Sequence, residues 1–101
     1  MGVILKSLPV VTIAAGGTAV PLSATTVDKV VAVYVSPLAA NTGVTYVGDS
    51  AVLASTTRGV QVAKGTFIKV EFEGQLIDLA NIFIDGTTGD KASVSYLVKT
   101  T

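Results

Sequence analysis

The organisation of this chain is clearest in nine residues near its middle, Asn41-Thr42-Gly43-Val44-Thr45-Tyr46-Val47-Gly48-Asp49. Asn41 and Gly43 are residue types that favour backbone at positive φ, and Gly48-Asp49 is a second signal of the same kind. The residues between these two signals are good strand formers. The pattern therefore predicts a turn, a short strand and a second turn.

The strand candidate that precedes this stretch, Asp28 to Ser36, is the most apolar in the chain. Alternation gives it two apolar faces, with Val31, Val33 and Val35 on one and Val30, Ala32 and Tyr34 on the other. A strand that is apolar on both faces is typical of a position inside a sheet that is covered on both sides. We therefore expect a central strand here.

Three strand candidates follow the central stretch and alternate clearly. Thr66 to Phe72 would direct Ile68, Val70 and Phe72 inward, and Phe67, Lys69 and Glu71 outward. Asn81 to Asp85 would direct Ile82 and Ile84 inward, and Lys91 to Lys99 would place Ala92, Val94, Tyr96 and Val98 on one face. Leu76 to Ala80 is predicted to form one helical turn or a loop packed on the end of a sheet.

About eight short strands, separated by turn signals, predict an all-β protein with little or no helix. Their spacing of roughly 8–12 residues is typical of an antiparallel β-sandwich or a jelly-roll-like fold. At 101 residues the chain is long enough for one domain. We assign that domain to residues 9–101.

Residues 1–8 are predicted to be an edge strand with a kink or an arm that pairs with a neighbouring subunit. Val3, Ile4, Leu5 and Leu8 are a large apolar content for a terminus, which usually frays unless it is docked. Pro9 cannot donate a hydrogen bond to a ladder, so it marks an edge position or a bend.

The composition argues against several functional classes. Charged residues make up 14% of the chain, against ~25% in ordinary soluble domains, so part of the surface is expected to be covered by a partner. Seven basic residues balance seven acidic ones without a basic run, which disfavours nucleic-acid binding. No apolar run approaches the ~18 residues of a membrane span. The first residues do not form a signal peptide, so we expect a soluble chain without membrane or nucleic-acid partners.

No catalytic residue, metal ligand or cofactor site is predicted. The chain contains no His and no Cys, which excludes histidine-based triads and the common zinc sites. Asp85 and Asp90 flank a Gly-rich hairpin loop and could in principle hold a hard cation. The segment lacks the ligand spacing of an EF-hand, so turn chemistry is the preferred interpretation.

The candidate site is instead an interface. Arg58 is the single arginine, a residue type enriched at binding hot spots, although a lone surface arginine explains it as well. Phe67 and Phe83 fall on the outward parity of their strands, where either a loop of the same domain or a partner could cover them. With the arm, the candidate interface residues are Val3, Ile4, Leu5, Leu8, Arg58, Phe67 and Phe83.

The order of motifs resembles that of small β-sandwich virion proteins of tailed bacteriophages, of the capsid decoration (cement) type. It runs through Val20-Pro21-Leu22-Ser23, Asn41-Thr42-Gly43, Tyr46-Val47-Gly48, Gly59-Val60, Lys64-Gly65, Leu79, Ile82-Phe83-Ile84-Asp85-Gly86, Val94 and Tyr96, over about residues 10–99. These motifs are turns and strands, so the resemblance carries no active site to this chain.

The resemblance implies a non-enzymatic protein of the virion, made in the host cytoplasm, that stabilises the head by bridging capsid subunits. It implies the major capsid protein or another virion protein as partner, and a homo-oligomer, with a trimer favoured. The chain lacks the separate arm or second domain of many decoration proteins, apart from residues 1–8. A tail, neck or head-fibre component is therefore the first alternative, and a carbohydrate-binding β-sandwich module is the second.

Overall fold

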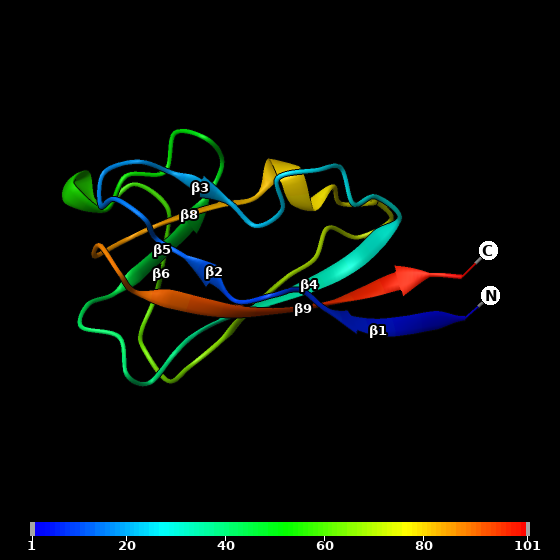
Figure 1. Ribbon diagram of the computed structural model, residues 1–101. Helices are drawn as coiled ribbons and strands as arrows, with labels where there is room; N and C mark the ends of the chain where they lie inside the picture. Colours follow the sequence, from blue (N-terminus) through cyan, green and yellow to red (C-terminus); the bar gives the residue numbers. More distant parts are fainter. Residues whose placement is uncertain (1, 101) are drawn as a thin grey trace.

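The computed structural model describes residues 2–100 and is an all-β structure of nine strands (Figure 1). The strands are β1 (Val3–Ser7), β2 (Val11–Thr12), β3 (Val20–Pro21), β4 (Val30–Pro37), β5 (Thr45–Gly48), β6 (Val60–Val62), β7 (Ile68–Val70), β8 (Phe83–Asp85) and β9 (Lys91–Lys99). Two single 3₁₀ turns, η1 (Ala54–Thr56) and η2 (Leu79–Asn81), complete the regular structure. A helical turn or a loop was predicted for Leu76 to Ala80; its first three residues are a loop, and Leu79 and Ala80 begin η2.

The strands form two antiparallel sheets that lie face to face (Figure 1). One sheet has the order β1-β9-β4-β7, with β2 also paired to β9, and the other has the order β3-β8-β5-β6. We call them the large sheet and the small sheet. Their pairs are nested in sequence: β2 pairs with β9, β3 with β8, β4 with β7 and β5 with β6.

Nested pairing of this kind describes one long hairpin that has been rolled so that successive pairs alternate between two sheets. The contacts of β4 with β9 and of β5 with β8 join the pairs within each sheet. This is the strand arrangement of a jelly roll. The predicted fold class is confirmed, and of the two architectures left open by the sequence the jelly roll is the one observed.

The core lies between the two sheets and is built from the alternation that the sequence predicted. On β9, Ala92, Val94 and Tyr96 are buried, and Val98 is partly buried against the same cluster. Ile82 and Ile84 are buried on the opposite layer. These inward positions are therefore confirmed, because the period of two along a strand matches one covered face.

The prediction for the two faces of β4 was wrong at its first residues. The register shifts between Val30 and Ala32, which is a β-bulge at Val31. An extra residue in a strand reverses the parity of those before it. Val30 therefore faces the core together with Val33 and Val35. Ala32 and Tyr34 lie on the opposite face, where Ala32 is buried and Tyr34 is partly buried.

The role predicted for Asn41 and Gly43 was also wrong in its mechanism. The residues with positive φ are Lys29, Thr57 and five glycines, and neither Asn41 nor Gly43 nor Gly48 is among them. Gly43 is instead required by close approach, because a Cβ there would collide with the Thr87 hydroxyl. Asn41 acts through its side chain, which bonds to the backbone of Lys91.

The first strand extends beyond the body of the sandwich. β1 pairs with the second half of β9 from Val3–Lys99 to Ser7–Ser95 (Figure 1), and beyond this pairing the Thr100 amide donates to the Gly2 carbonyl. The small sheet does not reach over this end, which contributes to the elongated dimensions of 41 × 25 × 22 Å. Every residue of β1 is exposed. Of the arm predicted at residues 1–8, Met1 lies outside the described residues.

Candidate functional site

The buried carboxylates bind the protein's own backbone. Asp85 is fully buried and accepts hydrogen bonds from the amides of Gly17 at 3.0 Å and Ala54 at 2.8 Å. Asp90 accepts from the amides of Thr42 at 2.9 Å and Gly43 at 3.0 Å. Within residues 2–100 no group of three acidic side chains is placed to hold a metal ion. Each of these two aspartates therefore holds distant loop segments together through hydrogen bonds to their backbone amides, and we call each such contact a clamp.

Asp90 is held as a carboxylate by these contacts. Burial raises the pKa of its side chain, but the Thr42 and Gly43 amides, the Thr42 hydroxyl and the charge of Lys64 act in the opposite direction. The net effect is a pKa below the ordinary value of 3.8. The clamp is therefore formed throughout the neutral pH range.

Two depressions in the surface are lined mainly by apolar side chains, and the first lies on the outside of the large sheet. Leu5, Tyr34, Phe67 and Leu97 line a shallow depression there together with Ser36 and Ser95. We call these four apolar residues the outer patch. The register explains the grouping, since Leu5 pairs with Leu97 and Tyr34 pairs with Ser95, so that these side chains share one face.

The aromatic residues of the outer patch are in contact with each other. The ring centroids of Tyr34 and Phe67 are 6.1 Å apart and the rings are tilted by 52°. Phe67 nevertheless stays 65% exposed and Leu5 64% exposed. Side chains of this size exposed side by side are typical of a surface that a partner covers.

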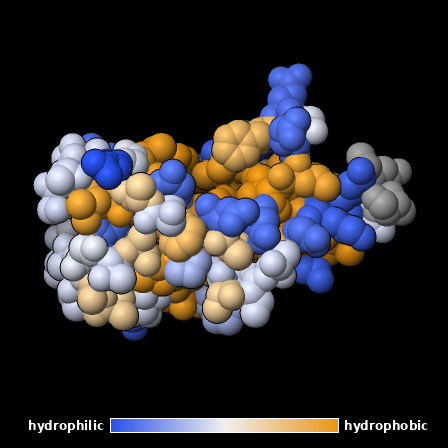
Figure 2. Space-filling view, turned by 90° about the horizontal axis from the view of Figure 1, so that it is seen from above, coloured by the Kyte–Doolittle hydropathy of each residue, from blue (hydrophilic) through white to orange (hydrophobic). Residues whose placement is uncertain are grey.

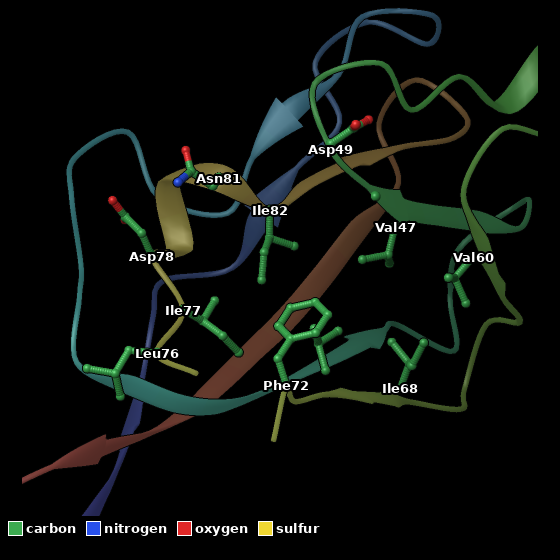
Figure 3. A pocket seen from close by; sticks show the side chains of 12 residues that line it. Val47, Asp49, Val60, Ile68, Phe72, Leu76, Ile77, Asp78, Asn81 and Ile82 are labelled. Atoms are coloured by element: carbon green, nitrogen blue, oxygen red, sulfur yellow. The ribbon is translucent and has the colours of Figure 1, made fainter. Parts of the chain in front are cut away.

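The second apolar surface is a groove of about 470 Å³ at the open side of the sandwich, which we call the edge groove (Figure 3). It lies between β7 of the large sheet and β5–β6 of the small sheet, and its end is formed by the segment leading into η2. Its lining residues are Val47, Gly48, Asp49, Val60, Ile68, Val70, Phe72, Leu76, Ile77, Asp78, Asn81 and Ile82. Phe72 is 58% exposed at its margin, and hydrophobic residues gather in the middle of the face shown in Figure 2.

Strand β7 separates the two apolar surfaces. Ile68 and Val70 point into the edge groove, whereas Lys69 and its neighbours Phe67 and Glu71 lie on the outer face. Lys69 and Glu71 form an exposed ion pair of 3.4 Å, in agreement with the outward direction predicted for both side chains. Residues 67–70 thus carry apolar side chains towards both surfaces.

The structure brings together some of the candidate interface residues and separates others. Leu5 and Phe67 meet in the outer patch, and Val3 and Ile4 are 52% and 50% exposed on the same strand as Leu5. Leu8 is partly buried against the core. Phe83 is half-buried on the small sheet, where it pairs with Pro21 and Gly48. Arg58 is exposed in the loop before β6, where its backbone pairs with Leu53.

Sequence reasoning missed Tyr34 and Leu97 in the outer patch, and Phe72 and Leu76 at the edge groove. The outward parity of Tyr34 was visible, but it was interpreted as a second covered face. Leu97 was also on outward parity, and its partner Leu5 could have been found only with the register of β1 on β9. Phe72 was expected inside, but the small sheet does not extend far enough to cover it.

We compared the chain with family models, with curated proteins and with solved structures. None of them matches. The described residues contain no helix that is both long and apolar enough to cross a membrane. The function is therefore inferred from the surfaces and the fold.

Proposed function

We propose that this chain is a non-enzymatic structural protein of a tailed-phage virion, and specifically a capsid decoration protein that binds the head surface. The observation that carries the proposal is the outer patch, an apolar surface on a regular sheet face. A decoration protein needs a surface of this kind to bind the lattice of capsid subunits. The resemblance of the chain's motifs to small virion proteins supports the same assignment.

The surroundings of the outer patch fit a flat contact with another protein. Its depression has small hydroxyl residues beside the apolar ones, Ser36 and Ser95, with Ser7 bonded to Ser95 at 3.3 Å. A partner can pack closely against serines and hydrogen-bond to them. Interfaces with an apolar centre and a polar margin follow this pattern.

The fold itself supports two classes. Jelly rolls occur both in viral capsid proteins and in lectins, and a fold alone does not determine function. A carbohydrate-binding module therefore stays the alternative from a different class, with the Tyr34–Phe67 pair as its stacking platform. A tail, neck or head-fibre component is the alternative within the virion.

The direct test is mass spectrometry of purified particles from a host that carries this coding sequence, followed by cryo-electron microscopy. Density for the jelly roll on the head is the expected result, and density on the tail, neck or fibre would support the virion alternative. Absence from the particles, together with binding on a glycan array, would favour the carbohydrate module.

The outer patch is tested by comparing Phe67→Ser with Val10→Ser, which alters an exposed side chain away from the patch. We expect Phe67→Ser to reduce attachment to particles about tenfold or more, because it removes a large apolar side chain that is 65% exposed in the outer patch. Val10→Ser should attach like the unmodified chain. Equal attachment of both variants would contradict the role of the patch.

A further inference from the structure

The large sheet ends in two strands that each have a free edge. β1 lies at one end of the order β1-β9-β4-β7 and β7 lies at the other. β1 has five consecutive paired residues without a bulge or an internal proline. Natural edges usually carry such interruptions or charges because a regular free edge is a template for pairing with another strand. Lys6 is the single charge on β1.

The free edge of β1 presents a regular set of unpaired backbone groups. The amide of Leu8 donates to Val94 and the amide of Thr100 donates to Gly2, so even-numbered residues face β9. In an antiparallel ladder, residues whose backbone groups bond to the neighbouring strand alternate with residues whose backbone groups point away from it. The amides and carbonyls of Val3, Leu5 and Ser7 therefore point away from β9.

Apolar side chains stand on both faces of β1. Leu5 belongs to the outer face, while Ile4 pairs with Val98 on the face that continues the core. Ile4 is nonetheless 50% exposed, since the small sheet ends before it. A partner that covered one face would leave the other exposed, whereas a strand added beside β1 places neighbours on both.

Apolar side chains also lie on both faces of the sheet at β7, as they do at β1. Its inner side chains, Ile68 and Val70, line the edge groove, and Phe67 stands on the outer face. The charged residues lining the groove are Asp49 and Asp78, both acidic, whereas the charge on β1 is Lys6. The edge groove beside β7 is therefore complementary in charge to Lys6, and the two strands match in hydrophobic pattern. Lys69, the charge on β7 itself, points to the opposite, outer face, where it pairs with Glu71.

We propose that the free edge of β1 in one copy of this chain pairs with the free edge of β7 in a second copy. Strand directions alternate through the large sheet, so a second copy in the same orientation places its β1 antiparallel to β7. The inner faces of the two sheets then lie on the same side. Ile4 of the second copy covers the edge groove, Lys6 approaches its acidic residues, and Leu5 extends the outer face beyond Phe67.

The proposed contact uses two different surfaces of the same chain. Repetition of such a head-to-tail contact closes into a ring or grows into a filament, depending on the rotation between copies. The inference does not depend on a role in the virion, because self-association is a property of the purified chain.

The test is the mass of the purified full-length chain by light scattering and sedimentation velocity, up to about millimolar concentration. We expect association that increases with concentration. Leu5→Pro removes an amide that points to the free edge and leaves the bonds to β9 in place, and proline is tolerated on edges. It should weaken association more than tenfold, and more than Leu5→Ala, which removes most of the side chain but keeps the amide.

Charge gives an independent test with a matched control. Lys6→Glu should weaken association at least fivefold because it places a carboxylate beside Asp49 and Asp78. Lys91→Glu makes the same charge change on an exposed side chain of β9 that β1 does not contact, and it should leave association unchanged. Circular dichroism confirms that the variants fold. A monomer throughout the concentration range, or equal association of Leu5→Pro and Leu5→Ala, would overturn the proposal.

Discussion

Asn41 and Lys91 hold two distant segments together through a reciprocal pair of hydrogen bonds. The side-chain amide of Asn41 donates to the Lys91 carbonyl at 2.8 Å, and the Lys91 amide donates to Asn41 Oδ1 at 2.9 Å. The asparagine side chain thus imitates the edge of a strand at the start of β9. It fixes the loop after β4 to the hairpin that precedes the last strand.

We expect Asn41→Ala to destabilise the protein by about 1–3 kcal/mol, because the Lys91 amide loses its partner at a buried position. The Lys91 carbonyl loses one of its two donors and keeps its bond from the Leu38 amide. Asn41→Asp keeps the acceptor for the Lys91 amide, but it replaces the donor to the Lys91 carbonyl with a carboxylate oxygen. Two acceptors then face each other, so this variant should be destabilised as well. Urea unfolding of the variants measures both effects. A change below about 0.5 kcal/mol in Asn41→Ala would show that water replaces the side chain without cost.

Asp90 should make stability depend on pH in the acidic range. A carboxyl group whose pKa is lower in the folded state contributes stability above its unfolded pKa, and this contribution is lost as pH falls through the folded pKa. The protein should therefore lose stability below about pH 4, near the unfolded pKa of an aspartate. Asp90→Asn should reduce this loss and be less stable than the unmodified chain at pH 7. Identical pH profiles for the two proteins would contradict the role of Asp90.

Thr45 is a site where a substitution should stabilise the fold. It is fully buried on the core face of β5, and its hydroxyl has no hydrogen-bond partner in the described part of the chain. Thr45→Val keeps the shape and removes the uncompensated polar group. We expect a gain of about 1 kcal/mol in the free energy of unfolding. A loss on thermal unfolding would mean that an ordered water satisfies the hydroxyl.

Gly43 should tolerate a side chain only if the neighbouring Thr87 is replaced by a smaller residue. A Cβ at position 43 would meet the Thr87 hydroxyl, although the backbone there does not have positive φ. Gly43→Ala should therefore destabilise by about 1–3 kcal/mol through crowding. Adding Thr87→Ala should recover part of that loss, which a double-mutant cycle measures. Absence of coupling between the two positions would indicate that the loops containing Gly43 and Thr87 move apart without a cost in free energy.

The outer patch and the core should respond differently to the same kind of change. Phe67→Ser should alter the free energy of unfolding by less than about 1 kcal/mol, because the side chain is already 65% exposed. Ile84→Ser, at a fully buried position, should cost more than about 3 kcal/mol. Chemical unfolding of the two variants checks this contrast. A large loss in Phe67→Ser would mean that the patch supports the fold.

The sequence by itself determined the all-β class, nearly all the strands and the inward residues of β8 and β9. These depend on local alternation and turn signals, which act between neighbours in the chain. It also identified Leu5 and Phe67 as candidate contact residues, because each is a large apolar side chain in a position where it is not required for the core.

Only the tertiary structure decided how the strands are nested. It also decided the positions of the outer patch and the edge groove. The bulge at Val31 reverses parity without a signal in composition, and the pairing of Leu5 with Leu97 joins residues from the two ends of the chain. The exposure of Phe72 depends on where the small sheet ends. Such features arise from contacts between distant segments, whose register local patterns do not specify.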